Sequence, residues 1–291
     1  MDSTKIEEGE FGPRLVLAEP WAAVIADLAT RNHVQELYLN YALGWHGRDL
    51  DFLSQLSELK GLHVLAPELE DISGILALTN LKSLKLEVAS RATLDLAALP
   101  SLQLFSGFWS NVSSSLFSCS NLEWLRLIGY SQPDSKGFSK LRALRGVALY
   151  SARLRELGEL AVLPLSYLSM AHCRRLVLSS EPLLNQILRE VNLVDCRSIS
   201  RLDAFAGSKE LRVLIAEDCG DIDSIQCLAS LRQLEVLRIG GNTDVTDGNL
   251  TVLRDFPKLR NLAFTQRKHY NLSWKALPPE LFESRYHSSW A

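Results

Sequence analysis

The sequence predicts an α/β solenoid, in which short strands stack into a parallel sheet and short helical or 3-10 segments lead from one strand to the next. Three observations support this prediction. The pattern L-x-x-L-x-L, with Val, Ile, Met, Phe, Ala or once Gly at its apolar positions, recurs eleven times. Its copies begin 20 to 25 residues apart, and the segments between them carry regularly spaced apolar residues. Self-similarity at a fixed period of this length is typical of repeat architectures.

Each copy of the pattern predicts one short strand, because alternating apolar residues mark a strand with one buried face. A single unit is too small to bury that face alone, so it stacks on its neighbours. The array is therefore expected to span residues 34–267. The copies begin at Val34, Leu59, Leu81, Leu102, Leu122, Leu144, Leu165, Leu188, Leu211, Leu234 and Leu259.

The return segments carry apolar residues every two or three positions, as in Leu69, Ile72 and Ile75. This spacing favours short helical or 3-10 turns. Repeats of this length leave little room for long helices.

The sequence resembles the leucine-rich-repeat family over about residues 34–265, with short units like those of bacterial or phosphatase-regulator proteins. The resemblance implies a curved horseshoe with a parallel concave sheet. In the family, the residue eight past the first leucine is commonly Asn or Cys, and its side chain satisfies backbone groups inside the turn. Only four of the eleven positions fit here, so we expect a more regular second half and a ladder of buried thiols at Cys173, Cys196 and Cys219. The position holds Ala42, Pro67, Ala89, Ser110, Tyr130, Ala152, Cys173, Cys196, Cys219, Asn242 and Arg267.

Both ends of the array are expected to carry caps, because terminal repeats otherwise expose their core. Residues 1–33 predict an N-terminal cap, with a strand at 14–17 and a helix that Pro20 opens near its first turn. Residues 268–291 lose the repeat but remain apolar, with Tyr286 and Trp290 among them, which predicts a C-terminal cap. A partner-binding tail is the alternative for this last segment.

Composition and charge narrow the function classes. The net charge of −3 argues against general nucleic-acid affinity. The sequence holds no apolar run of about 18 residues, which a membrane span needs. The N-terminal residues do not have the charge pattern of a secretory signal. The five cysteines lack CxxC spacing, so we expect a reducing, cytoplasmic compartment.

No catalytic motif is present, and the six histidines lack metal-ligand spacing. His172 and Asp195 follow neighbouring strands and are expected to lie near one another, but such a pair without a nucleophile is no catalytic site. The acidic residues Asp218, Asp221 and Asp223 are typical of turns. We therefore expect no enzyme, no metal and no cofactor.

The third, fifth and seventh positions of each repeat point out of the sheet, so stacking does not dictate their chemistry. Aromatic residues gather there in repeats four to seven, with Trp109 and Tyr130 just beyond their strands, and exposed aromatic residues are enriched at binding hot spots. Self-association and coverage by loops or caps are the alternatives. The predicted partner-binding residues are Tyr38, His63, Phe108, Trp109, Trp124, Arg126, Tyr130, Tyr150, Tyr167, Glu190, Glu217 and Arg238.

The second position of each repeat forms another stripe, which we expect along one lateral edge. Six of its eleven residues are basic; they are Lys60, Lys82, Arg145, Arg189, Arg212 and Arg260. This basic stripe is interpreted either as a solvated flank of the array or as a surface that steers an acidic partner toward it. An acidic zone is expected elsewhere, at Asp195, Glu217, Asp218, Asp221 and Asp223.

These observations together predict a non-enzymatic scaffold that binds a protein partner on the concave face. A sharper version is a bacterial inhibitor or immunity-type protein that covers a toxin or enzyme. The alternatives are a sensor of polyanions, nucleic acid or another ligand that uses the basic edge, and a self-associating structural protein or homodimer. Because the basic stripe and the acidic zone are expected at different places on the surface, the sequence favours a specific protein partner over a polyanion.

Overall fold

The computed structural model describes residues 4–89, 92–113, 115–183 and 187–282. The chain divides into two compact units, residues 1–128 with 140–144, and residues 129–139 with 145–291. The predicted C-terminal residues Tyr286 and Trp290 lie outside the described residues. The two units are described one at a time.

The first unit begins with a hairpin, in which β1 pairs antiparallel with β2. From β2 onward, each strand pairs parallel with the next one in the chain. The strands are β1 (Lys5–Glu8), β2 (Pro13–Leu17), β3 (Glu36–Asn40), β4 (Gly61–Leu65), β5 (Ser83–Glu87), β6 (Leu104–Phe108) and β7 (Trp124–Ile128).

The second unit continues the pattern with parallel neighbours throughout. Its strands are β8 (Gly146–Tyr150), β9 (Tyr167–Ala171), β10 (Glu190–Val194), β11 (Val213–Glu217), β12 (Val236–Gly240) and β13 (Asn261–Phe264). Every strand from β3 to β13 begins at the third position of a predicted repeat. The predicted solenoid of stacked α/β repeats is therefore confirmed.

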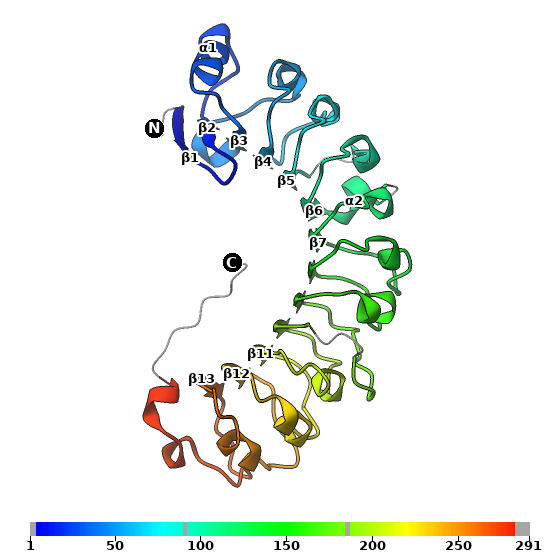
Figure 1. Ribbon diagram of the computed structural model, residues 1–291, viewed down its shortest axis with the longest axis vertical. Helices are drawn as coiled ribbons and strands as arrows, with labels where there is room; N and C mark the ends of the chain where they lie inside the picture. The colour runs from blue at the N-terminus through cyan, green and yellow to red at the C-terminus, as the bar shows by residue number, and fades with distance from the viewer. Residues whose placement is uncertain (1–3, 90–91, 114, 184–186, 283–291) are drawn as a thin grey trace. The chain divides into compact units, whose positions relative to one another are not determined.

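Short turns connect the strands, and most of them are 3-10 helices of three to five residues. In each unit the strands lie along one side and these turns along the other (Figure 1). The α-helices among the described residues are α1 (Ala23–Arg31) and α2 (Trp109–Val112). The helix predicted near Pro20 thus begins at Ala23, without a side-chain cap, and ends as expected before Asn32.

The interior of each repeat is apolar, and the predicted cysteine ladder is confirmed in the second unit. Cys173, Cys196 and Cys219 are buried free thiols. Their Sγ atoms lie 3.5, 3.2 and 3.5 Å from the backbone oxygens of Leu149, Met170 and Leu193, each on the preceding strand. The thiols therefore act as small apolar residues with a weak donor.

The second unit is also more regular at the end of its strands, as predicted. The residue that follows each of β8 to β12 has a left-handed backbone, with φ between 49° and 63°. Those residues are Ser151, His172, Asp195, Asp218 and Gly241. Because this conformation repeats, the side chains of the first four residues leave the backbone in the same way in successive turns. We call this border, where the strands end, the turn edge.

No helix within the described part of the chain is long and apolar enough to cross a bilayer.

Candidate functional site

The outward-pointing residues at the third, fifth and seventh repeat positions form what we call the strand face. In the first unit, several predicted partner-binding residues lie partly exposed on it. They are Tyr38, His63, Phe108, Trp124 and Arg126. The strand positions follow from the register, in which Tyr38 pairs with His63, and Ser106 pairs with Arg126.

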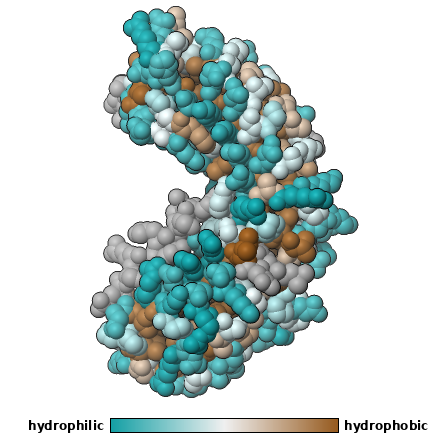
Figure 2. All heavy atoms as spheres, in the orientation of Figure 1, coloured by the Kyte–Doolittle hydropathy of each residue, from teal (hydrophilic) through white to brown (hydrophobic). Residues whose placement is uncertain are grey.

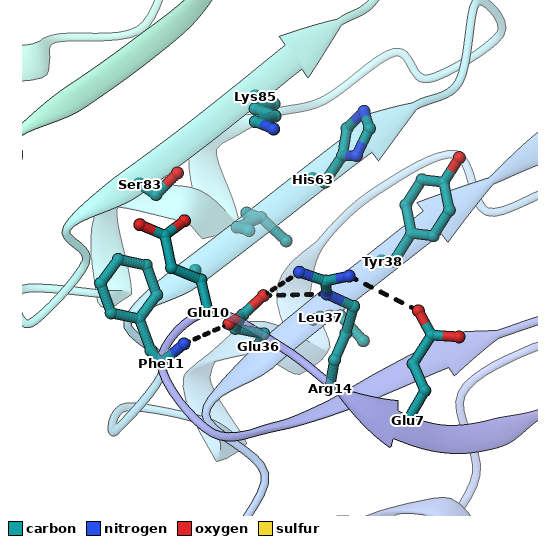
Figure 3. Close-up of a pocket in the computed structure, with 12 residues that line it drawn as sticks. Glu7, Glu10, Phe11, Arg14, Glu36, Leu37, Tyr38, His63, Ser83 and Lys85 are labelled. Atoms are coloured by element: carbon teal, nitrogen blue, oxygen red, sulfur yellow. Dashed lines mark hydrogen bonds and ion pairs between the residues drawn. The ribbon is translucent and has the colours of Figure 1, made fainter. Parts of the chain in front are cut away.

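A pocket of about 200 Å³ opens on this strand face, under the loop that joins β1 to β2 (Figure 3). Glu10 and Phe11 of the loop form one wall, and Leu37 and Leu62 contribute apolar lining. Ser83 and Lys85 of β5 lie across from the loop. Sequence reasoning missed this pocket because the strand β1, with sequence KIEE, has no apolar alternation.

An ion pair fixes the loop over the pocket. The Nε and Nη2 atoms of Arg14 donate to Oε2 of Glu36 at 2.8 and 2.6 Å, and the backbone N–H of Phe11 donates to its Oε1. Glu36 is only 6% exposed. Gly61 makes room for it, since a Cβ there would lie 2.8 Å from Glu36 Cγ. A buried carboxylate is stable only with such partners.

Tyr38 and His63 form a stacked aromatic pair beside the pocket. Their ring centroids are 4.5 Å apart, with an interplanar angle of 19°. Burial, and then the nearby charge of Lys85, lower the pKa of His63 to about 4. The imidazole is therefore neutral near pH 7 and offers a partner a hydrogen-bonding ring rather than a positive charge.

This shift predicts a pH dependence of stability. The unfolded chain protonates His63 near its ordinary pKa of 6.5, whereas the folded chain takes up that proton only near 4. The contribution of neutral His63 to the free energy of unfolding is fully present above pH 6.5 and is lost as the pH falls toward 4. Between pH 7 and 5, the native chain should lose about 1 kcal/mol more than His63→Gln, after discounting for solvent screening. Urea unfolding at both values measures the difference, and equal losses would contradict the assignment.

A second charged contact organises the strand face around Phe108 and Trp124. Arg126 Nη1 lies 3.1 Å from Oε1 of Glu87 and donates to Ser106 Oγ at 3.2 Å. The small Ser106 on β6 lets the guanidinium of β7 reach the carboxylate of β5. The contact holds Arg126 in one orientation between strands, as a preorganised binding group.

In the second unit, Tyr150 is partly exposed on the strand face, and Glu217 and Arg238 pair at 2.9 Å. The face is not equally accessible throughout. Tyr167 and Glu190 are each 7% exposed, and Asn192 donates to Oε1 of Glu190 at 2.9 Å and to the hydroxyl oxygen of Tyr167 at 3.4 Å. Contrary to the sequence expectation, these two side chains are components of a polar network rather than displayed groups.

The structure also corrects the prediction for Trp109 and Tyr130. Trp109 is 7% exposed, because the short helix α2 starts there and turns the indole inward. Tyr130 is fully buried, and its hydroxyl donates to the carbonyl oxygen of Asp134 at 2.9 Å. Tyr130 occupies the repeat position that holds Cys or Asn in later repeats, and this position faces the interior.

At the turn edge, the predicted proximity of His172 and Asp195 is confirmed, with Nδ1 and Oδ2 2.9 Å apart. The prediction of Asp195 as part of an acidic zone is wrong, because Arg174 and Arg197 also bind its carboxylate. Asp218 instead accepts from the backbone and side-chain nitrogens of Asn242.

The second-position stripe does run along one edge within each unit. Successive members are joined by backbone hydrogen bonds, for example from Lys82 N to Lys60 O and from Arg212 N to Arg189 O. Arg260 pairs with Glu235 of the same stripe at 2.8 Å, so part of its charge is neutralised.

The face drawn in Figure 2 is mostly hydrophilic, with small, separate apolar patches. Among the described residues, no group of three or more His, Cys, Asp or Glu side chains is arranged to hold a metal ion.

Comparison with known proteins agrees with this geometry. No family model matches the sequence, and no curated protein matches it. Among solved structures, an internalin of Listeria monocytogenes, inlF, is 21% identical, with 88% of this chain and 83% of that chain covered and a TM-score of 0.54. A leucine-rich-repeat protein of Leptospira interrogans is 18% identical, with coverage of 90% and 86% and a TM-score of 0.42, too low to carry weight. The repeats and the likeness to the internalin show that the chain has a leucine-rich-repeat fold.

Proposed function

We propose that the chain is a non-enzymatic scaffold that binds a protein partner through its strand face. The observation that carries the proposal is the set of partly exposed aromatic side chains on that face, which repeat stacking does not require. They are Tyr38, Phe108, Trp124 and Tyr150. Aromatic and arginine side chains dominate binding energy at protein interfaces.

The rigidity of the strand face supports this role. Arg126 and Arg238 are each held by a carboxylate, on Glu87 and Glu217, before any partner binds. Side chains that are already ordered lose less entropy on association. The pocket beneath the β1–β2 loop provides an additional recess in the first unit for a partner side chain.

A finer version of the proposal is an inhibitor or immunity-type protein that covers a bacterial toxin or enzyme in the cytoplasm. Its support is that the repeat pattern occupies most of the 291 residues. The buried, unpaired cysteines Cys173, Cys196 and Cys219 agree with a reducing compartment.

The test is capture of partners from a lysate of the native host, with quantification by mass spectrometry. The native chain is compared with Trp124→Ala and Tyr150→Ala, and with Trp274→Ala as a matched control outside the strands. We expect both strand-face variants to lower recovery of a specific partner at least tenfold, as for hot-spot residues, while the control retains it. Unchanged recovery with both variants would reject the strand face as the binding surface.

Two alternative functions, a homodimer and a nucleic-acid sensor, can be tested by related measurements. A homodimer would appear as a doubled mass in solution that Trp124→Ala or Tyr150→Ala reduces. A nucleic-acid sensor using the second-position edge would bind DNA or RNA with steep salt dependence, and would weaken with Lys82→Ala plus Arg212→Ala.

A further inference from the structure

The turn edge of the second unit carries a compact group of arginines in three consecutive turns. We call this group the arginine block; its members are Arg153, Arg155, Arg174, Arg175 and Arg197, and all five are exposed. Backbone contacts show that the turns adjoin one another. Val177 N donates to Arg155 O at 2.8 Å, and Ser198 Oγ donates to Arg174 O at 2.7 Å.

The repeat itself builds the centre of the block. Arg153, Arg174 and Arg197 each follow the first leucine of their repeat by nine residues. Their strands β8, β9 and β10 pair in register, with neighbours about 4.8 Å apart. Like charges in adjacent turns repel one another, so a nearby counter-charge stabilises this arrangement.

Asp195 supplies that counter-charge. Its Oδ2 accepts from Nε and Nη2 of Arg174 at 3.0 and 2.8 Å, its Oδ1 accepts from Nε of Arg197 at 2.7 Å, and His172 lies at 2.9 Å. The hydrogen bonds from His172, Arg174 and Arg197 hold the pKa of the Asp195 carboxyl well below its usual range. Asp195 thus orients two guanidinium groups that remain largely exposed.

One carboxylate does not neutralise the block. Within the described part of the chain, Arg153, Arg155 and Arg175 have no ion-pair partner. The turns at 151–157, 172–178 and 195–201 contain two acidic residues, Asp195 and Glu156, against the five arginines of the block and Arg201, which pairs with Asp203 just beyond the last turn. The patch therefore presents a strong positive potential to solvent.

The sign of charge reverses at the next turn. Residues 218–224 contain three aspartates and no basic residue, and 241–247 contain two more aspartates. This acidic stretch adjoins the block directly, since Asp223 N donates to Ser200 O at 2.9 Å. An anionic ligand is therefore attracted to the three basic turns and repelled beyond them.

We propose that the arginine block is a second binding surface, distinct from the strand face, that takes an acidic segment of a polypeptide. Arginine pairs with carboxylates through two parallel hydrogen bonds, and Asp195 already orients Arg174 and Arg197. The three turns contain no Phe, Tyr or Trp on which nucleic-acid bases could stack. The adjoining aspartates also limit the surface to a short ligand.

The test uses the full chain and a fluorescein-labelled deca-glutamate peptide, followed by fluorescence anisotropy at low and increasing salt. The variant Arg153→Gln plus Arg175→Gln removes two unpaired charges of the block. The control, Arg145→Gln plus Arg189→Gln, removes two exposed charges from the second-position edge at the other end of the strands. We expect the block variant to weaken binding about two- to thirtyfold, as for two exposed ion pairs, and the control to leave it unchanged.

Each contrary result overturns the proposal. Equal weakening by both variants would mean general attraction to a charged surface, and no binding at 20 mM salt would exclude the site. Tighter binding of a ten-nucleotide oligothymidine, lost in the same block variant, would reassign the surface to nucleic acid. Thermal melting of both variants verifies that they remain folded.

Discussion

Replacing Trp45 with alanine is expected to lower the free energy of unfolding by about 3–5 kcal/mol, the usual cost of removing a buried large aromatic side chain. Trp45 is 1% exposed and is among the largest fully buried side chains. It belongs to one of the longest repeats, in which 25 residues separate Val34 from Leu59. The indole fills the interior that these extra residues enclose, and its backbone N donates to Asn40 O at 3.2 Å.

Urea unfolding followed by circular dichroism measures this loss. Trp45→Phe, which keeps most of the buried ring, should lose clearly less than the alanine variant. Trp274→Ala, at a side chain that is 50% exposed, should change stability by less than about 0.5 kcal/mol. A loss below 1 kcal/mol for Trp45→Ala would show that the indole does not support the first repeats.

The substitution Arg14→Met is expected to destabilise the first unit by about 3 kcal/mol, because it leaves the buried carboxylate of Glu36 without its cation. Among the described residues, the backbone N–H of Phe11 alone would still donate to that carboxylate. The loop from Gly9 to Gly12 should then detach from the pocket, since this ion pair joins β2 to β3. Urea unfolding measures the stability, and proteolysis of the loop reports its release.

A double-mutant cycle isolates the pair. Adding Glu36→Gln to Arg14→Met should restore part of the loss, because a neutral amide is cheaper to bury than an unpaired carboxylate. Simple additivity of the two single losses would show that Arg14 and Glu36 do not stabilise each other.

The strands were predictable because one pattern position determines each of them. The third position of the repeat marks the first residue of every strand from Glu36 in β3 to Asn261 in β13. Eleven copies of the same six-residue pattern remove the ambiguity that any single hexapeptide would leave. The same logic placed the thiols of Cys173, Cys196 and Cys219 inside the stack.

The candidate site was less predictable, because its chemistry depends on side chains that the pattern does not constrain. Tyr130 occupies an interior position, and its aromatic character alone suggested exposure. Tyr167 and Glu190 are outward by register but buried, and both hydrogen-bond to Asn192. Periodicity gives the direction of a side chain, whereas accessibility depends on its neighbours from other repeats.

In the arginine block, too, the repeat pattern predicts the positions of the side chains but not their contacts. Arg153, Arg174 and Arg197 share one repeat position, so their alignment was readable from spacing alone. The pairing of Arg174 and Arg197 with Asp195 was not readable, because it depends on the left-handed backbone that presents this carboxylate at the turn edge. The sequence alone predicts Asp195 in one acidic zone with Asp218, although the Asp195 carboxylate binds Arg174 and Arg197.

The central claim, that the strand face binds a protein, is tested most directly by hydroxyl-radical footprinting of the purified chain with and without a captured partner. We predict that Trp124, Tyr150 and Tyr38 lose reactivity in the complex, and that Trp274, outside the strands, does not change. Protection of Trp274 with unchanged reactivity at Trp124, Tyr150 and Tyr38 would contradict the claim.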